Sequence, residues 1–178
     1  MSLPNIIVAT SKQLEYLQLV PEVVNEILRT REIVIDAESA VVGRLASIIA
    51  KLVKLGFKVH VINVEKAVVS GDKKMVIEGY KLMLKVKTHK NPYRHAIHRP
   101  RHPINIFKKT IKNMLPKHNW LKYKLAKKIK VYIGVPQELK SKLIIRILDC
   151  DANYLGRTKT VSLATIAKEL GWKGVIPQ

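Results

Sequence analysis

The fold is decided by EIVIDAESAVVGRLASIIAKLVKLGFKVHVINV, residues 32–64. Its first six residues, EIVIDA (32–37), form a short β-branched run that is typical of a strand buried on both faces. Residues 38–56 carry apolar side chains at helical spacing, namely Val42, Leu45, Ile49 and Leu52 or Val53. Residues 57–64 return to an extended pattern, so the stretch predicts a βαβ unit with a right-handed crossover in a parallel sheet.

The ends of this helix and the next turn carry their own signals. Ser39 is a candidate N-cap, and Gly56 is a candidate for the left-handed residue that follows a helix. A second extended run with a turn at residues 70–72 is expected within residues 66–74. The sequence VVSGDKK lacks the glycine spacing and the Lys-Ser/Thr of a phosphate-binding loop, which favours a simple basic turn.

Two basic helices are predicted downstream. Residues 103–116 are bracketed by prolines, and a proline suits the first helical position and also ends a helix. One arc of this helix is apolar and is expected in the core: Ile104, Phe107, Ile111, Met114 and Leu115. The adjacent arc, with Lys108, Lys109 and Lys112, is expected to meet a partner. Residues 119–128 form the second helix, with Asn119 as candidate cap and Trp120 expected in the core.

The two ends of the chain add further elements. Residues 1–32 have helical character broken by Pro21. Strands are expected at 129–136 and 143–148, and a short helix within 161–174 begins at Ser162. That helix resembles the first helix of a helix-turn-helix, but no recognition helix follows it, which disfavours this class of DNA binder.

The charge of the chain points to a polyanionic partner. It has 33 Lys and Arg against 13 Asp and Glu, a net charge of +20. Between Glu78 and Glu138 there is no acidic residue, whereas this interval holds sixteen Lys or Arg and five His. A solvated surface normally mixes both signs, so a single-sign interval of this length favours binding to nucleic acid.

The most basic stretch is THKNPYRHAIHRPRHP, residues 88–103. Three functions are considered for it. His95, His98 and His102 could ligate zinc, but no cysteine or carboxylate lies nearby in sequence. His95 and His98 could act as acid and base on RNA, although no orienting carboxylate is evident. Binding of a polyanion needs only the arginines, lysines and histidines that are present, and is favoured.

Composition also argues against other classes of protein. No apolar run is long enough to span a membrane, and no secretory signal pattern is evident at the start. The single cysteine, Cys150, suits a reducing compartment and is expected to be a buried apolar side chain. Aromatic residues make up only 6% of the chain, which favours a binder of RNA backbone and shape over a base-stacking platform.

Several motifs together resemble the ribosomal protein L13 family of the large subunit. They are DAESAVVGRLASIIAKLV (36–53), INVEKAVVSGDK (62–73), KNMLPKH (112–118) and KVYIGVPQE (130–138), in the family's order over about residues 33–138. The tail NYLGRTKTVSLATIAKELGWKG (153–174) and the insert NPYRHAIHRPRHPINIF are similar to archaeal and eukaryotic members. The family's usual GMLP reads NMLP here, with Asn113 in place of glycine.

This resemblance implies an α/β protein, a three-layer α/β/α domain around a four-stranded parallel sheet. The expected division is an N-terminal helical extension (1–32), an rRNA-binding domain (33–140) and a C-terminal tail (141–178) that packs on the domain or on ribosomal neighbours. It implies a non-enzymatic structural constituent of the large ribosomal subunit, cytoplasmic in the ribosome, without a cofactor or metal. The expected partners are large-subunit rRNA and neighbouring ribosomal proteins, and neither a membrane nor a small-molecule substrate. The slightly acidic extension is expected to contact protein.

The resemblance and the basic helix faces together predict the RNA-binding residues. Within 88–103, Arg94, Arg99 and Arg101 are expected to clamp phosphates, and three histidines to donate hydrogen bonds. The full set is Arg44, Lys73, Lys74, Lys87, His89, Lys90, Arg94, His98, Arg99, Arg101, His102, Lys108, Lys109, Lys112, Lys117, His118, Lys122 and Lys124. An RNA-processing enzyme and a chromatin-type DNA binder are the alternative classes.

Overall fold

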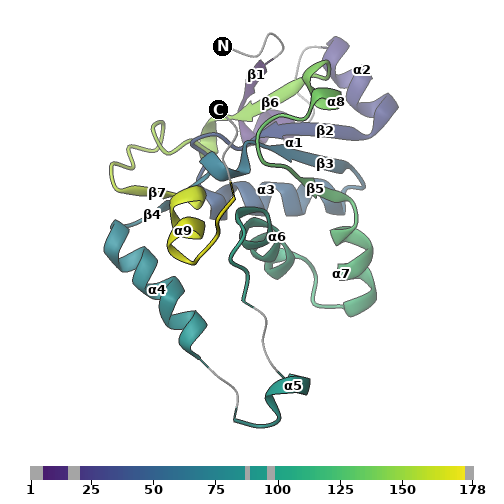
Figure 1. Ribbon diagram of the computed structural model, residues 1–178. Helices are drawn as coiled ribbons and strands as arrows, with labels where there is room; N and C mark the ends of the chain where they lie inside the picture. Colours follow the sequence, from purple (N-terminus) through teal and green to yellow (C-terminus); the bar gives the residue numbers. More distant parts are fainter. Residues whose placement is uncertain (1–5, 16–20, 87–88, 96–98, 175–178) are drawn as a thin grey trace.

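The protein is built around a parallel β-sheet (Figure 1). The computed structural model describes residues 6–15, 21–86, 89–95 and 99–174. The five strands of this sheet, in spatial order, are β1 (Ile6–Ala9), β6 (Ile144–Ile147), β2 (Glu32–Asp36), β3 (Lys58–Ile62) and β5 (Ile129–Val131). A separate antiparallel ribbon pairs β4 (Val68–Ser70) with β7 (Thr160–Ser162).

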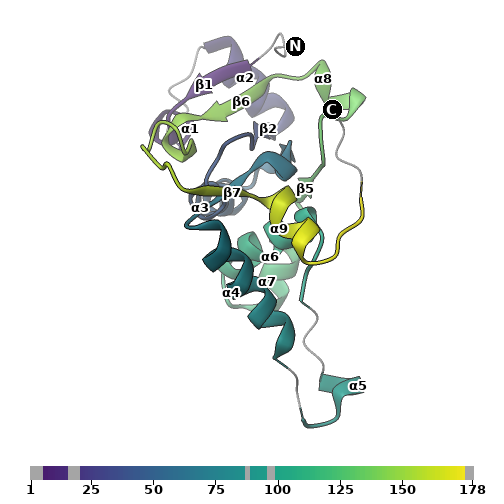
Figure 2. The same ribbon diagram turned by 60° about the vertical axis from the view of Figure 1, so that its left-hand side comes forward.

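Helices surround the sheet and extend to one side of it (Figures 1 and 2). Those before residue 90 are α1 (Ser11–Glu15), α2 (Pro21–Thr30), α3 (Val42–Lys54) and α4 (Lys73–Lys85). The later ones are α5 (Pro92–His95), α6 (Pro103–Met114), α7 (Asn119–Ala126), α8 (Gln137–Lys140) and α9 (Leu163–Glu169). Two 3₁₀ turns, η1 (Val64–Lys66) and η2 (Leu148–Cys150), complete the described elements.

The predicted βαβ unit is confirmed as β2, α3 and β3. Residues Ile33 and Ile35 of β2 lie opposite Val59 and Val61 of β3 in a parallel register. Helix α3 begins later than expected, with Val41 in the N-cap position. Ser39 does not cap it, because its backbone has a positive φ of 57° in the turn that precedes the helix. Gly56 does follow the helix in the left-handed region, as predicted.

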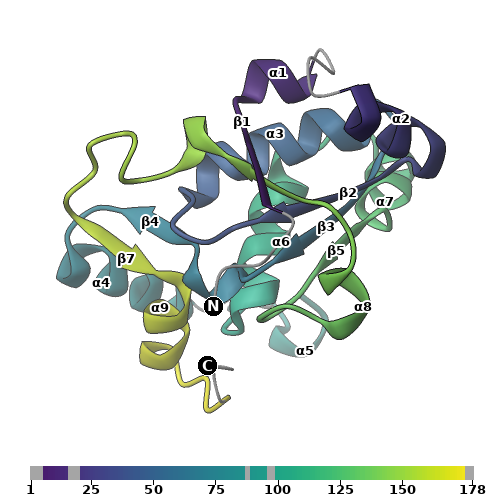
Figure 3. The same ribbon diagram turned by 90° about the horizontal axis from the view of Figure 1, so that it is seen from above.

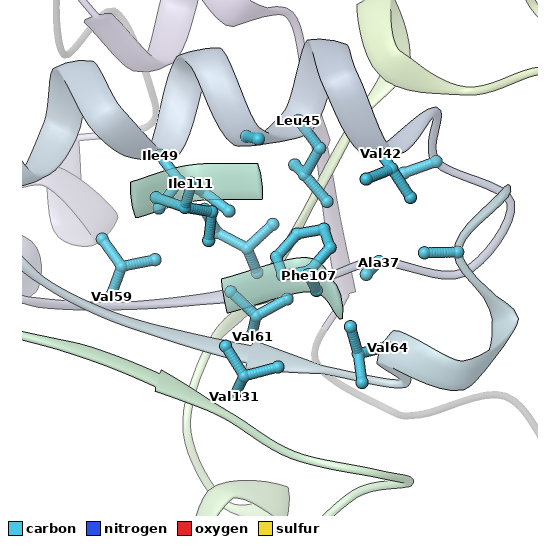
Figure 4. Packing of buried hydrophobic residues seen from close by; sticks show 14 of the residues in the cluster. Ala37, Val42, Leu45, Ile49, Val59, Val61, Val64, Phe107, Ile111 and Val131 are labelled. Carbon is cyan, nitrogen blue, oxygen red and sulfur yellow. The ribbon is translucent and has the colours of Figure 1, made fainter. Parts of the chain in front are cut away.

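The sheet buries both of its faces, so the layers are roughly α/β/α. On one face, alternate strand residues such as Val61 and Val131 pack against Leu45 of α3 and Phe107 of α6 (Figure 4). On the other face, Val34, Ile62 and Ile144 pack against Leu139 of α8. Figure 3 shows α3 and α8 on opposite sides of the strands. The strand buried on both faces that EIVIDA predicts is therefore present as β2.

The sheet has one strand more than the four expected. β6, from the segment after residue 140, pairs with β2 and with β1. β1, from the segment before residue 33, pairs only with β6 and was not predicted as a strand. Its four residues pair with a partner more than 130 positions away, and no local pattern reports such a pairing. Both end segments thus contribute to the sheet, and their status as an extension and a tail stays a prediction.

A polar network ties the carboxyl ends of β2, β3 and β6 together. The Asp36 carboxylate is buried and accepts hydrogen bonds from Arg146 Nη2 at 2.5 Å and Asn63 Nδ2 at 2.9 Å. Arg146 also donates to Glu38 at 2.7 Å. β3 and β6 lie on either side of β2 in the sheet. These bonds hold both strands in register with β2.

Helix α6 lies against α3 with most of its predicted apolar arc inward. Phe107, Ile111 and Leu115 are buried, as predicted. Met114 was predicted wrongly, since it is 39% exposed, and Ile106 takes a buried position instead. The helix therefore turns Ile106 rather than Met114 toward the core, and this rotation decides which way its lysines point.

Candidate nucleic-acid interface

An open groove of about 790 Å³ lies between α6, α7 and the segment 99–102 that precedes α6. Seven of the predicted RNA-binding residues line it: Arg99, Arg101, His102, Lys108, Lys109, Lys112 and Lys122. None of the described residues in its lining is acidic. The groove therefore presents a field of one sign in a concave surface, which favours an anionic ligand.

Helix α6 positions three of the groove's cations. Burial of Ile106, Phe107 and Ile111 against the sheet and α3 fixes the rotation of this helix. Lys108, Lys109 and Lys112 consequently fall on its outer side, as the arc of lysines predicts. Helix α7 buries only Leu125 and contributes Lys122 from the facing wall.

His102 has a second function that the sequence did not indicate. It is the N-cap of α6, and its Nδ1 accepts a hydrogen bond from the Ile104 backbone N–H at 3.2 Å. In a neutral imidazole that accepts at Nδ1, the proton lies on Nε2, which is then a donor. Its ring also packs edge-on against Trp172, with centroids 5.3 Å apart. His102 thus enters the groove in a fixed orientation.

His118 plays the equivalent part for α7. Its Nδ1 accepts from the Leu121 backbone N–H at 3.5 Å, and this makes His118 the N-cap. The prediction of Asn119 as the cap was wrong by one residue; Asn119 is the first helical residue and lines the groove instead. Trp120 was predicted in the core but is 67% exposed, with Lys124 Nζ 4.9 Å from its ring centroid.

Other predicted residues lie outside the groove. Lys117, His118 and Lys124 are exposed near its α7 wall. His89, Lys90 and Arg94 are exposed at and beside α5, well away from the sheet (Figures 1 and 2). Three more lie apart from the groove, with Arg44 on the first turn of α3 and Lys73 and Lys74 on the first turn of α4. Lys87 and His98 lie outside the described residues.

Some groove residues were missed from the sequence. Asn105, Asn113, Asn119 and Tyr123 line it beside the lysines. They carry no charge and therefore do not belong to a basic run, although all four lie in the same helices as the predicted lysines, α6 and α7. The sequence did single out three of them for other reasons: Asn113 replaces the family's glycine in NMLP, Asn119 is a candidate cap, and Tyr123 offers a ring for base stacking.

A second basic hollow lies near the first turn of α4. The turn at Ser70 and Gly71 meets Arg157, Thr158 and Lys159, and together with Gly156 they line a shallow site of about 390 Å³. The Gly71 backbone N–H donates to the Lys159 carbonyl at 2.9 Å, which joins segments almost ninety residues apart. Lys73 and Lys74 directly follow this turn in the sequence and were predicted with it. Arg157 and Lys159 were not predicted, because only folding brings them beside the turn.

Two acidic residues, Glu32 and Glu38, pair with lysines away from the groove. The hydrogen bond from Lys142 Nζ to Glu32, at 2.7 Å, lowers the pKa of that carboxyl. The bond from Lys66 to Glu38, at 3.0 Å, does the same for Glu38. Both pairs lie on or beside β2, so these carboxylates offset lysines of the sheet and leave the charge of the groove uncompensated.

The zinc and acid–base hypotheses for residues 88–103 both include His98, which lies outside the described residues, so both stay hypotheses. Within residues 6–15, 21–86, 89–95 and 99–174 no three His, Cys, Asp or Glu side chains gather in a way that could hold a metal ion. Cys150 is buried, as expected, and burial raises its thiol pKa to about 12. A thiol with that pKa remains protonated and packs as an apolar side chain. Among the described helices, none is long and apolar enough to cross a membrane.

Comparison with known proteins decides the family. The family model of ribosomal protein L13 matches residues 30–138. The chain belongs to the ribosomal protein L13 family. This confirms the resemblance of the four ordered motifs, which covered about residues 33–138.

Relatives in this family cover most of the chain. The large ribosomal subunit protein uL13 of Saccharolobus solfataricus is 48% identical over 142 residues, which are 80% of this chain and 94% of the relative. That of Sulfolobus acidocaldarius is 46% identical over 78% of this chain and 93% of its own length. That of Archaeoglobus fulgidus is 40% identical over 80% of this chain and 89% of its own length. These archaeal relatives agree with the expected archaeal and eukaryotic type.

Proposed function

We propose that this protein is a non-enzymatic, structural constituent of the large ribosomal subunit that binds folded large-subunit rRNA. Its relatives are named as large ribosomal subunit proteins, and they match four-fifths of the chain. A place in the cytoplasmic ribosome, with rRNA and neighbouring large-subunit proteins as partners, follows from this assignment. A net charge of +20 is consistent with a chain whose repulsion is relieved by a polyanion.

The groove is the observation that carries the proposal. It is lined by seven Arg, Lys and His side chains, which come from two helices and one extended segment. No acidic residue lies in the lining. Such convergence of segments 99–102, α6 and α7 has no evident use in folding, because like charges repel when no anion lies between them. A phosphate backbone in the groove removes that repulsion.

The side chains suit phosphate in different ways. Arg99 and Arg101 present planar forks that bind phosphate oxygens in pairs, whereas Lys108, Lys109 and Lys112 act as point charges. His102 donates from Nε2, because its Nδ1 is occupied by the α6 backbone. These contacts fix the position of an RNA strand and read its backbone and shape rather than its sequence.

The first experiment is sedimentation of native lysate through a sucrose gradient at low and high salt. The protein is expected to migrate with large subunits and polysomes and to remain there after a high-salt wash. Migration at the top of the gradient, or with chromosomal DNA, would reject the proposal. Turnover of an RNA substrate by the purified protein would instead support the enzyme alternative.

A salt titration tests the groove itself. Binding of the full chain to purified large-subunit rRNA should weaken steeply with salt, and each lost phosphate contact should flatten the log–log slope by roughly 0.7–0.9. Replacing Arg99 and Arg101 by Ala is therefore expected to flatten it by roughly 1.4–1.8 units. The matched control replaces Lys54 and Lys140, two exposed lysines outside the groove, by Ala. Equal slopes for both double variants would contradict a specific groove.

A further inference from the structure

A smaller pocket opens behind the groove. It has a volume of about 190 Å³ and lies between α4, α6 and the end of α9. Its walls are mainly apolar and include Tyr80, Met83 and Leu84 of α4, Ile106 of α6, and Leu170. Figures 1 and 2 show α4 running beside α9 and then away from the sheet. The C-terminal half of α4 contributes Met83 and Leu84 to the lining of the pocket.

The pocket adjoins the groove. Four residues, Arg99, Pro100, Lys109 and Asn113, line both. An RNA strand whose phosphates occupy the groove could therefore place one of its bases in the pocket while its backbone stays in contact with the lysines. A duplex could not do this, because its bases are stacked inside the helix.

The chemistry of the pocket fits a nucleobase. A base has two apolar faces and an edge of hydrogen-bonding groups, and the pocket offers apolar and aromatic walls with Thr110 and Asn113 as polar groups. The volume is smaller than the roughly 300–1,000 Å³ typical of sites for drug-sized ligands, so it matches a single ring system. The site is thus sized for one base and not for a base pair.

Arg99 supplies an independent indication of a ligand. Its Nε–H is buried and has no hydrogen-bond partner among the described residues. Buried polar groups of this kind are rare in native proteins, because an unpaired donor loses its hydration without compensation. The edge of a base that enters where groove and pocket meet supplies an acceptor once the Arg99 side chain turns toward it, because the Nε atom has less than 1 Å² of accessible surface in this structure.

We propose that this pocket holds a single unstacked nucleobase of the RNA strand whose phosphates lie in the groove. The inference rests on the proposed function, since the same strand occupies both sites. The groove then supplies affinity that depends on salt, and the pocket supplies affinity that does not, because insertion of a neutral base releases no counterions.

Pocket-filling variants test the proposal. Met83→Trp fills the pocket from α4 and Thr110→Phe fills it from α6, and both residues are partly exposed, so larger side chains can be accommodated. Met75→Trp is the matched control, because Met75 is 73% exposed on the same helix and does not line the pocket. Each full-length variant is titrated with purified large-subunit rRNA at several salt concentrations, after its thermal unfolding has shown that it folds.

The two filling variants should bind roughly 5- to 150-fold more weakly than the Met75→Trp control at every salt concentration, which corresponds to the loss of one stacked base. The slope against salt should stay as in wild type. Affinities equal to the control would overturn the inference, and a flattened slope would also overturn it by showing that filling disturbs the phosphate contacts. Failure of wild type to bind rRNA with a steep salt dependence would instead overturn the proposed function.

Discussion

Helices α3 and α4 have the same length, thirteen residues, but opposite relations to the core. Seven residues of α3 are buried, whereas in α4 only Ile77 is. The outer side of α4 carries an apolar stripe. It consists of Met75, Leu82 and, directly after the helix, Val86, and each of these side chains is at least 64% exposed. The sequences of the two helices also differ, because α3 gathers its apolar side chains on one face, whereas α4 has them both toward the core, as at Leu84, and exposed, as at Met75 and Leu82.

The comparison separates a helix that belongs to the core from a helix that we propose to contact RNA. Helix α3 covers the sheet, and its Leu45 and Ile49 lie beside Phe107 and Ile111 of α6 (Figure 4). Helix α4 packs on the core cluster through partly buried Val76, Tyr80 and Leu84, whereas its one buried residue, Ile77, is not part of that cluster. The helix also forms one wall of the pocket behind the groove. We therefore expect mutations in α3 to affect unfolding and those in α4 to affect RNA binding.

The largest effect is expected from paired leucine truncations. Leu45→Ala on α3 removes a fully buried side chain and should lower the free energy of unfolding by about 2.7–5 kcal/mol. Leu82→Ala on α4, where the side chain is 65% exposed, should change it by less than about 0.5 kcal/mol. Urea unfolding followed by circular dichroism gives both values. Similar losses at the two sites would mean that α4 belongs to the cooperative core.

Ion pairs provide the next comparison. Arg146→Met leaves the buried Asp36 carboxylate without its charged partner at the end of β2, just before α3, and should cost about 2–3 kcal/mol. Lys81→Met removes the exposed pair between α4 and Glu169 of α9, and no measurable change in stability is expected. The same unfolding assay applies. An unaffected Arg146 variant would show that Asn63 and the backbone alone satisfy Asp36.

Gly79 tests whether α4 unfolds with the rest of the protein. It lies exposed within α4, and a Cβ there would meet no atom within 4 Å. Gly79→Ala should stabilise this helix by roughly 0.5–1 kcal/mol. Amide hydrogen exchange should slow in α4, and it should slow in α3 only if the two helices open together. No slowing in α4 would contradict the assignment of a regular helix there.

The smallest effect is expected from His60 in β3, which lies on the sheet face opposite α3. Burial lowers its pKa, so below the ordinary pKa near 6.5 the unfolded chain binds more protons than the folded one. The stability of wild type should therefore decrease as pH falls from 7.5 to 5.5, and His60→Gln should remove part of that decrease. Urea midpoints across this range test it, and identical pH profiles would exclude His60 as a contributor. Glu32 stays in its ion pair over this range, since its pKa is lowered.

Much of the fold could be predicted because its signals are local. The βαβ unit, α6, α7 and the helix begun by Ser162 each follow from apolar spacing and caps within a single segment. Errors occurred where neighbours decided the outcome. Ser39 was displaced from its cap position by a tight turn, and Trp120 stayed outside because α7 buries only Leu125.

The parallel α/β class, the basic interval between Glu78 and Glu138 and the membership of the family can all be read from the amino-acid sequence. These are properties of residue type and spacing, which the chain carries before it folds. Only the tertiary structure decided that β1 and β6 join the sheet, that seven dispersed side chains line one groove, and that a pocket with Arg99 at its mouth opens behind it. The physical reason is that each of these depends on packing between segments far apart in the chain, where the burial of one element sets the position of another.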